Sequence, residues 1–455
     1  MRFSTSLIHK QCVVIGGGSS GFGAALAAQR GGASVLLADR HGYLGGMGTA
    51  AGLSCYLNHH SGTQNLSGAI YREFVRRQNE RGMHYYDPVS QGDFFEPESC
   101  KVTMERLFLE AGGECLFHVM LTSVERVEDG WLVTFVHKGG STQVRCRYLV
   151  DTTGDGDACA LAGAEMTHGR RSDSKTQPMS MVVQLGGFDP NVWQDAGLPM
   201  VNGKYAVAGD HFSDEVADAY QQGLWSIPRN EIAMIWSMPC DPTRVTINGT
   251  RINGLSSCCA KETTLAEIEG RRQAEELCSF FIRYVPGFSR AYLLQTGPQI
   301  GVRESRRIIG RAVLMDSDVR DGRIPESSVT LCCYPIDVHN PEGSDTQFEM
   351  MEGVASAYGI PWECLVPKGI ENLAVAGRCI SATHEAAGSF RVMPTCMTLG
   401  EAAGTAVALA SQGKANLSDI SGYEIRQVME NALIDAGESG LSSIYENLKS
   451  INPVG

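Results

Sequence analysis

Three glycines near the start of the chain have the type and spacing of a phosphate-binding turn. Gly16, Gly18 and Gly21 follow a short apolar run and precede a helical pattern. Asp39 ends the next apolar run, 18 residues after Gly21. In a strand–turn–helix unit the first glycine permits the tight turn, and the second lets the backbone approach a pyrophosphate. An acid at the end of the second strand accepts hydrogen bonds from a ribose. The spacing therefore predicts a dinucleotide site.

Two further segments have the composition of ligand-binding loops. The segment LGGMGTAAG (44–52) directly follows the second apolar run and is too rich in glycine for a packing helix. The segment DTTGDGD (151–157) follows a later strand pattern, and open α/β sheets bind ligands where their strands end. The residues from this half of the chain that we expect to contact a dinucleotide are Gly16, Gly18, Ser20, Gly21, Asp39, Arg40, Gly45, Gly46, Met47, Gly154 and Asp155.

The elements that position these residues follow from the hydrophobic pattern. Residues 12–15 and 34–38 are short apolar runs typical of buried strands, and a small-residue helix is expected between them. Residues 115–150 are expected to form a β-meander of three strands joined by two glycine-containing turns. Glycine makes up 52 of the 455 residues, which suits an α/β protein with many tight turns.

Taken in order along the chain, these motifs resemble those of FAD-dependent oxidoreductases with the two-part architecture of glutathione-reductase-like and fumarate-reductase-like flavoproteins. The matching segments are spread from end to end of the sequence. They are VVIGGGSSGFGAALAAQRGGASVLLADR, LGGMGTAAGL, YLVDTTGDGDACALAGAE, GVRESRRIIG, CYPIDVHNP and IPWECLVPKGIENLAVAGRCISATHEAAGSFRVMPTCMTLGEAAGTAVALA.

The resemblance implies that FAD lies extended between the N-terminal glycines and a strand that returns near the C-terminus. The segment ENLAVAGRCIS (371–381) would be this strand, with Gly377 and Arg378 at its end. Many related flavoproteins carry Gly-Asp there, so Arg378 would pair with a phosphate rather than with a ribityl hydroxyl, and its partner stays open. A helix that begins near Pro394 and Thr395 would then direct its N-terminus at the flavin, and its dipole would stabilise the anionic reduced form.

We therefore expect an α/β fold: a Rossmann-like FAD-binding domain with a β-meander and an inserted α+β substrate domain. The expected division is 1–167 for the first part of the FAD-binding domain, 168–335 for the inserted substrate-binding domain, 336–412 for the return segment and 413–455 for a C-terminal helical tail. The sequence has neither a second glycine fingerprint for NAD(P)H nor a Cys-x-x-Cys dithiol. Both features would be expected of a disulfide reductase of this architecture.

The residues that could move a proton lie at the junction of the inserted and returning segments. Tyr334, Asp337 and His339 are close together in CYPIDVHNPEG, and clefts between domains are favoured ligand sites. Removing a hydride from a C–OH or C–NH centre requires a base for the other proton, and histidine has the side-chain pKa nearest neutrality. His384 is the rival base. The catalytic candidates are His339, His384, Tyr334 and Arg303.

The densest group of basic residues lies at 303–311. It consists of Arg303, Arg306, Arg307 and Arg311 in an otherwise acidic protein. Arginine suits bidentate binding of carboxylates, so an anionic substrate or the flavin could be the partner. Structural ion pairs are the other interpretation, and both stay open at this point.

The expected activity is transfer of a hydride between flavin N5 and a small organic substrate, which is anionic if an arginine binds it. The reaction would oxidise a C–O, C–N or C–C bond. The alternatives are a flavin-bearing electron-transfer subunit that works with a partner protein, and a redox-neutral or tRNA-modifying flavoprotein.

Composition narrows the partners. A formal charge of −13 disfavours nucleic acid, which requires a basic surface. No apolar run approaches the ~20 residues of a membrane span, and the first residues do not resemble a signal peptide. Fifteen scattered cysteines indicate reduced thiols, and no metal site is expected. We expect a cytoplasmic protein and leave open whether it forms a homo-oligomer.

Overall fold

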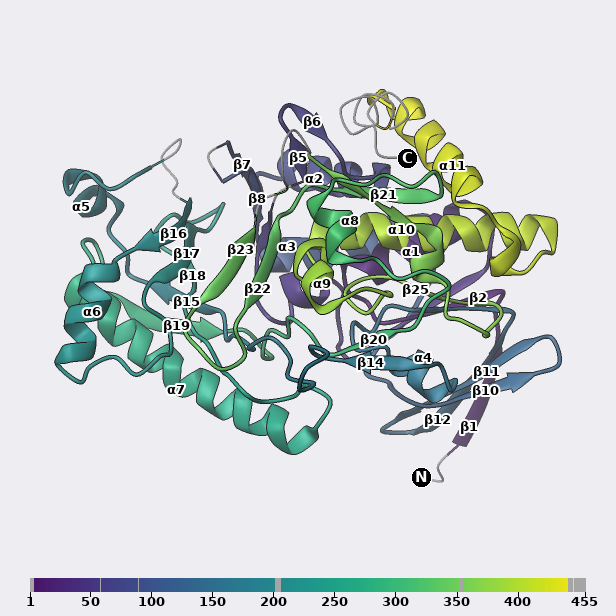
Figure 1. Ribbon diagram of the computed structural model, residues 1–455, viewed down its shortest axis with the longest axis horizontal. Helices are drawn as coiled ribbons and strands as arrows, with labels where there is room; N and C mark the ends of the chain where they lie inside the picture. The colour runs from purple at the N-terminus through teal and green to yellow at the C-terminus, as the bar shows by residue number, and fades with distance from the viewer. Residues whose placement is uncertain are drawn as a thin grey trace.

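The computed structural model describes residues 4–440 and 445, with the exception of 58, 89, 201–205, 350 and 352–355. For residues 4 and 206–211 it describes the backbone only. The chain forms a parallel sheet covered by helices, an antiparallel sheet to one side of it, and a smaller sheet near the N-terminus (Figure 1).

The parallel sheet has five strands in the order β25-β13-β2-β3-β9. All residues of its three central strands and of β25 are buried, as expected for a sheet with both faces covered. The expected Rossmann-like α/β fold is confirmed. The strands are β2 (Cys12–Ile15), β3 (Val35–Ala38), β9 (Glu114–Leu116), β13 (Tyr148–Asp151) and β25 (Leu373–Val375).

Two helices from opposite ends of the chain pack together against this sheet. They are α1 (Ser19–Arg30) and α10 (Met393–Gly413). A Cβ atom at Gly400 would lie 2.0 Å from the carbonyl oxygen of Ser20, and one at Gly404 would lie 2.1 Å from that of Ala24. Glycine is therefore required at both positions for the backbones to approach this closely.

The meander is shorter than the sequence pattern predicts. Its strands are β10 (Met120–Val127), β11 (Gly130–His137) and β12 (Gly140–Cys146). Strands β9 and β13, at the two ends of the expected meander, pair with the parallel sheet instead. The fourth strand is β1 (Ser4–His9), which lies parallel to β12 and was not predicted. The apolar pattern marked the strands but did not reveal which sheet they join.

The antiparallel sheet has the order β16-β17-β18-β15-β19 and packs on the long helix α7 (Ala260–Tyr284). Its core is a separate cluster that includes Trp193, Trp225 and Phe281. The domain boundaries given above stay predictions. The strands are β15 (Val183–Gly186), β16 (Ala206–His211), β17 (Ile232–Ser237), β18 (Val245–Asn248) and β19 (Tyr292–Thr296).

The remaining elements connect and cover these sheets. Strands β22 and β23 form a hairpin between the antiparallel sheet and helices α8 and α9 (Figure 1). The helices are α2 (Ala69–Glu80), α3 (Pro97–Glu110), α4 (Asp157–Leu161), α5 (Pro190–Asp195), α6 (Ser213–Gln221), α8 (Asp316–Arg320), α9 (His384–Phe390) and α11 (Gly422–Asp435). The strands are β4 (Cys55–Tyr56), β5 (His60–Ser61), β6 (Gln64–Asn65), β7 (His84–Asp87), β8 (Gly92–Phe95), β14 (Met166–His168), β20 (Arg306–Ile308), β21 (Ser328–Cys332), β22 (Ile336–His339), β23 (Thr346–Glu349) and β24 (Tyr358–Pro361).

A buried carboxyl group joins α10 to α2. Glu401 is 3% exposed, and its Oε2 accepts a hydrogen bond from the backbone N–H of Ile70 at 3.2 Å. Burial raises the pKa of Glu401 to about 7, although the backbone N–H groups at the start of α2 oppose the rise. Glu401 therefore binds its proton more tightly in the folded protein than in the unfolded chain.

We expect Glu401 to make stability depend on pH. Its pKa is higher in the folded state, so the free energy of unfolding falls as pH rises from about 4.5 to about 7, by at most ~3 kcal/mol. Glu401→Gln keeps an acceptor for Ile70 but removes the titration. Urea unfolding at pH 5 and pH 8 should show a smaller pH-dependent loss in the variant, and equal losses in both proteins would contradict this.

Candidate active site

The three glycines of the fingerprint have different structural roles. Gly16 has φ +104°, and a Cβ there would lie 2.5 Å from the carbonyl oxygen of Thr152. A Cβ at Gly21 would lie 1.7 Å from the carbonyl oxygen of Gly16. Gly18 is the N-cap of α1, and the nearest atom to its Cβ would be Gly46 Cα at 3.7 Å. The first and third glycines are thus required by the fold itself, whereas the second has room for a side chain in the protein alone.

The acid after β3 is held against this turn. Asp39 accepts hydrogen bonds from the backbone N–H of Gly17 at 2.5 Å and of His41 at 2.6 Å. Arg40 extends away from it and donates to Gln299 Oε1 at 2.9 Å. The loop that contains Gly45, Gly46 and Met47 follows, and its backbone lies beside Gly18. The structure therefore brings the turn, the acid and the glycine loop together.

The return strand closes the other side of the turn. A Cβ at Gly377 would lie 2.7 Å from Ser20 Oγ, so the end of β25 touches the start of α1. Arg378 donates to Asp155 Oδ1 at 2.9 Å and to Ser305 Oγ at 3.0 Å. Burial alone would raise the pKa of Asp155, but Arg378 holds it below its ordinary value. Asp155 is thus the partner of Arg378 that the sequence left open.

Two helix N-termini remain available to an anionic cofactor. Pro394 and Thr395 lie in the first turn of α10, as expected. The N-cap residues are Gly18 for α1 and Val392 for α10. Neither has a side chain that accepts a hydrogen bond from the N–H groups of the first turn. The N–H groups in the first turn of a helix attract phosphates and other anions. The residues present therefore fit an extended dinucleotide with its pyrophosphate at the start of α1 and its flavin end at the start of α10.

Two of the catalytic candidates, Tyr334 and His339, lie around one carboxylate at the junction hairpin. Tyr334 donates its hydroxyl hydrogen to Asp337 Oδ2 at 3.2 Å, and His339 Nε2 lies 3.5 Å from Asp337 Oδ1. Arg391 donates to the carbonyl oxygen of Asp337 at 2.8 Å. Burial, together with the charges of Arg303 and Arg391, lowers the pKa of His339 well below its ordinary value. His339 is therefore neutral at neutral pH.

The basic run 303–311 divides between two roles. Arg306 pairs with Asp157, and Arg307 pairs with Glu304. Arg311 donates to the carbonyl oxygen of Ser418 at 2.8 Å. Arg303 alone of the four belongs to the junction, where burial and the neighbouring arginines lower its pKa well below the ordinary value. Arg303 Nη1 donates to the carbonyl oxygen of Pro178 at 2.8 Å and to Ser180 Oγ at 2.7 Å. All four arginines therefore have structural contacts, and Arg303 differs from the others by lying at the junction.

His384, the rival base, lies in a different set of contacts. It begins α9, is 6% exposed, and its Nδ1 lies 2.8 Å from Glu304 Oε1. Glu304 is itself paired with the buried Arg307. His384 thus adjoins a buried structural ion pair, whereas His339 lies among several arginines.

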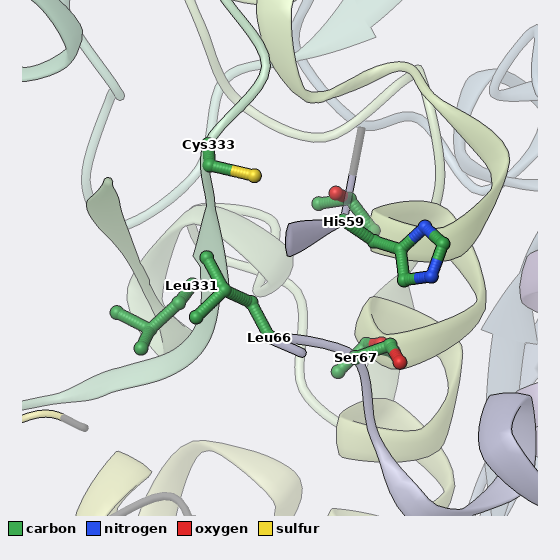
Figure 2. Close-up of a pocket in the computed structure, with 7 residues that line it drawn as sticks. His59, Leu66, Ser67, Leu331 and Cys333 are labelled. Atoms are coloured by element: carbon green, nitrogen blue, oxygen red, sulfur yellow. The ribbon is translucent and has the colours of Figure 1, made fainter. Parts of the chain in front are cut away.

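A narrow gap beside α10 contains none of the predicted site residues except Thr395. Figure 2 shows it between the β5–β6 hairpin and β21, with His59 on one side and Cys333 on the other. The gap leaves no room for a water-sized sphere, so it cannot hold a flavin ring. His59 Nε2 lies 3.0 Å from the buried carboxylate of Asp93, which also accepts from Tyr71.

Sequence reasoning missed the arginines that come from other elements. Arg229, Arg251 and Arg391 all act on the pKa of His339, yet they are far apart in the sequence. Arg391 stood in the matched segment SFRVMPT and could have been noticed there. Arg229 and Arg251 lie in the least recognisable part of the chain, where no motif marks them.

The fold and the site together define a flavoprotein of the extended-dinucleotide type. The family model for FAD dependent oxidoreductases matches residues 11–430, so the chain belongs to that family. The protein is therefore an enzyme, and its cofactor is FAD. No curated protein matches the chain.

Several solved structures of flavoproteins are similar to the chain at low identity. A geranylgeranyl bacteriochlorophyll reductase-like protein from Thermoplasma acidophilum has 13% identity and a TM-score of 0.48. The match covers 95% of this chain and 84% of the chain of that protein. The flavin-dependent brominase Bmp2 has 13% identity and a TM-score of 0.47, covering 93% and 83%. The myxobacterial chondrochloren halogenase CndH has 11% identity and a TM-score of 0.46, covering 97% and 82%.

Two features are absent from the residues that the structure describes. None of their helices has the length and apolarity to cross a membrane. Within the same residues, no group of three or more His, Cys, Asp or Glu side chains could hold a metal ion.

We expect Gly18→Ala and Gly21→Ala to fail in different ways. The Cβ at Gly18 meets no protein atom closer than 3.7 Å, so this variant should fold but bind FAD at least ~10-fold more weakly, because the methyl group occupies space needed by the pyrophosphate. Gly21→Ala should lose soluble folded protein. Flavin content and melting temperature distinguish the two. A Gly18→Ala protein with normal FAD affinity would show that the pyrophosphate lies elsewhere.

Proposed function

We propose that the enzyme transfers a hydride between flavin N5 and a small anionic organic substrate, with His339 as the proton acceptor. The observation that supports this most is a neutral, buried histidine surrounded by arginines at the junction of the cofactor fold and the antiparallel sheet. FAD supplies a two-electron acceptor or donor at this place when it is bound. The remaining steps fall to side chains of this chain.

The hydrogen bonds of His339 suit a general base. Its Nδ1 lies 2.9 Å from Thr346 Oγ1, and its backbone N–H donates to Gln177 Oε1 at 3.2 Å. If Nδ1 carries the proton and donates it to Thr346, then Nε2 presents a lone pair. A proton accepted at Nε2 would face the carboxylate of Asp337, which stabilises the charged ring.

The surrounding arginines couple proton acceptance to substrate binding. The charges of Arg303, Arg391 and Arg229 disfavour the protonated form of His339 in the free enzyme. An anionic substrate offsets those charges, so the pKa of His339 rises when the substrate binds. The base thus becomes stronger when there is a proton to accept.

The other interpretations give different results in one experiment. An electron-transfer subunit or a redox-neutral or tRNA-modifying flavoprotein is not expected to be reduced by a small acid. Anaerobic mixing of the purified holoenzyme with a panel of small organic acids, followed by flavin absorbance, tests the proposal. Bleaching by a member of the panel supports it.

We retain two expectations on sequence grounds. The cytoplasm remains the expected location, because fifteen scattered cysteines suit a reducing compartment. Nucleic acid remains an unexpected partner, because the formal charge is −13.

We expect His339→Ala to slow flavin reduction by ~100-fold or more at neutral pH, since general base catalysis contributes about that factor. The substrate is the acid that bleaches the wild-type flavin, and the rate is measured by anaerobic stopped-flow. FAD content should stay normal, because His339 makes no contact with the fingerprint residues in its described hydrogen bonds. His384→Ala serves as the comparison. A His339→Ala enzyme with most of the wild-type rate would exclude this base.

A further inference from the structure

Arg229 is a buried cation with unused hydrogen-bond donors. The residue is 5% exposed, and both its Nε and its Nη2 are buried without a hydrogen-bond partner. Burial lowers the pKa of Arg229, while the carboxylates of Glu231 and Asp337 oppose the effect. Burying a charged donor without a partner is strongly unfavourable, so such a group in a folded protein calls for an explanation.

Arg251 is a second buried arginine that acts on His339, and it differs from Arg229 in its hydrogen bonds. It is 1% exposed, but its Nη1 and Nη2 donate to four acceptors. These are the carbonyl oxygens of residues 340, 344 and 345 and the hydroxyl of Thr346. Arg251 therefore holds the β22–β23 hairpin in place, although its Nε is also buried without a partner, and its burial has a structural reason that Arg229 lacks.

Gln177 has an unused neutral donor beside His339. Gln177 is 1% exposed, and its Oε1 accepts the backbone N–H of His339 at 3.2 Å. Its Nε2 is buried without a partner. The accepted hydrogen bond fixes the amide beside His339 and so directs the unused N–H group at the same surroundings.

The charges of the cluster do not balance. Arg229, Arg251, Arg303 and Arg391 all act on His339, and all are positive. The carboxylates that act on Arg229 are Asp337 and Glu231. Asp337 also contacts Arg391 and His339. Asp345 is a third carboxylate, and it acts on Arg251. Four guanidinium groups against these three carboxylates leave a net positive charge of one, which a monovalent anion would neutralise.

We infer that this cluster is the binding site for the carboxylate of the substrate, with Arg229, Arg303 and the amide of Gln177 as donors. The inference rests on the proposed function, because it names the substrate class of the same site. A guanidinium group matches the two oxygens of a carboxylate in one plane. The substrate is then a small carboxylic acid whose reacting carbon lies near His339.

A carboxylate fits this donor set better than a phosphate. Asp337 lies inside the cluster, between Arg391 and His339, and would repel a phosphate dianion, whose two charges share one phosphate group. A carboxylate group gains the same guanidinium contacts with a single charge, and in malonate the second charge lies on a separate carboxylate. Phosphate nevertheless shares the chemistry, so it is included among the probes.

The test compares two buried arginines in the oxidised holoenzyme. Propionate, malonate and inorganic phosphate are added at constant ionic strength, and binding is followed by melting temperature and by the flavin difference spectrum. Arg229→Met should bind propionate and malonate at least ~10-fold more weakly, because it removes a charged donor. Without added anion it should melt at or above the wild-type temperature, since an unpaired buried charge is removed. Arg251→Met should melt lower, because four acceptors lose their donor.

The outcomes separate the inference from the proposed function. A lower melting temperature for Arg229→Met, an unchanged response to the carboxylates, or a response to phosphate alone would each overturn the inference. No turnover is needed for this measurement. If carboxylates bind but no carboxylic acid bleaches the flavin, the binding site stands and the proposed hydride transfer fails. If a compound without a carboxylate bleaches it and carboxylates do not bind, hydride transfer stands and this site fails.

Discussion

The close packing of α1 on α10 is the constraint on which the rest of the structure depends. At three glycines of this contact an added Cβ would lie 2.0–2.3 Å from a carbonyl oxygen of the other helix. They are Gly23, Gly400 and Gly404. Such distances leave no room for any other residue, so the helices can meet only through glycine. Because α1 belongs to the start of the chain and α10 to the end, this contact joins the two halves of the cofactor site.

The charge distribution follows from that arrangement. Strand β25 enters beside β13, which places Arg378 against Asp155 at the edge where the parallel strands end. The short α9 lies between β25 and α10 and brings Arg391 to Asp337 on the junction hairpin. An acidic protein thereby gathers buried arginines at one place. The paired ones stabilise the fold, and those without a full set of partners remain for a ligand.

The sequence predicted the cofactor fold well, because that part depends on local features. Glycine spacing, apolar runs and the position of Asp39 all act over a few residues, and β2, α1 and β3 form where they indicate. The meander is shorter than predicted, because the apolar pattern of a strand does not indicate which sheet the strand joins. The substrate cluster could be predicted only in part. His339, Asp337 and Tyr334 share one short motif, whereas Arg229 and Gln177 reach the cluster only through tertiary packing.

The central claim is that the charges of the arginines around His339 are not fully balanced until the anionic substrate binds. The pKa of His339, measured by NMR of ¹³C-histidine-labelled holoenzyme with and without malonate, tests this most directly, with His339→Ala to assign the signal. The account predicts a pKa well below 6.5 in the free enzyme, because burial and Arg303, Arg391 and Arg229 disfavour the charged ring. It predicts a clear rise when malonate binds. An ordinary pKa in the free enzyme, or one that malonate leaves unchanged, would contradict it.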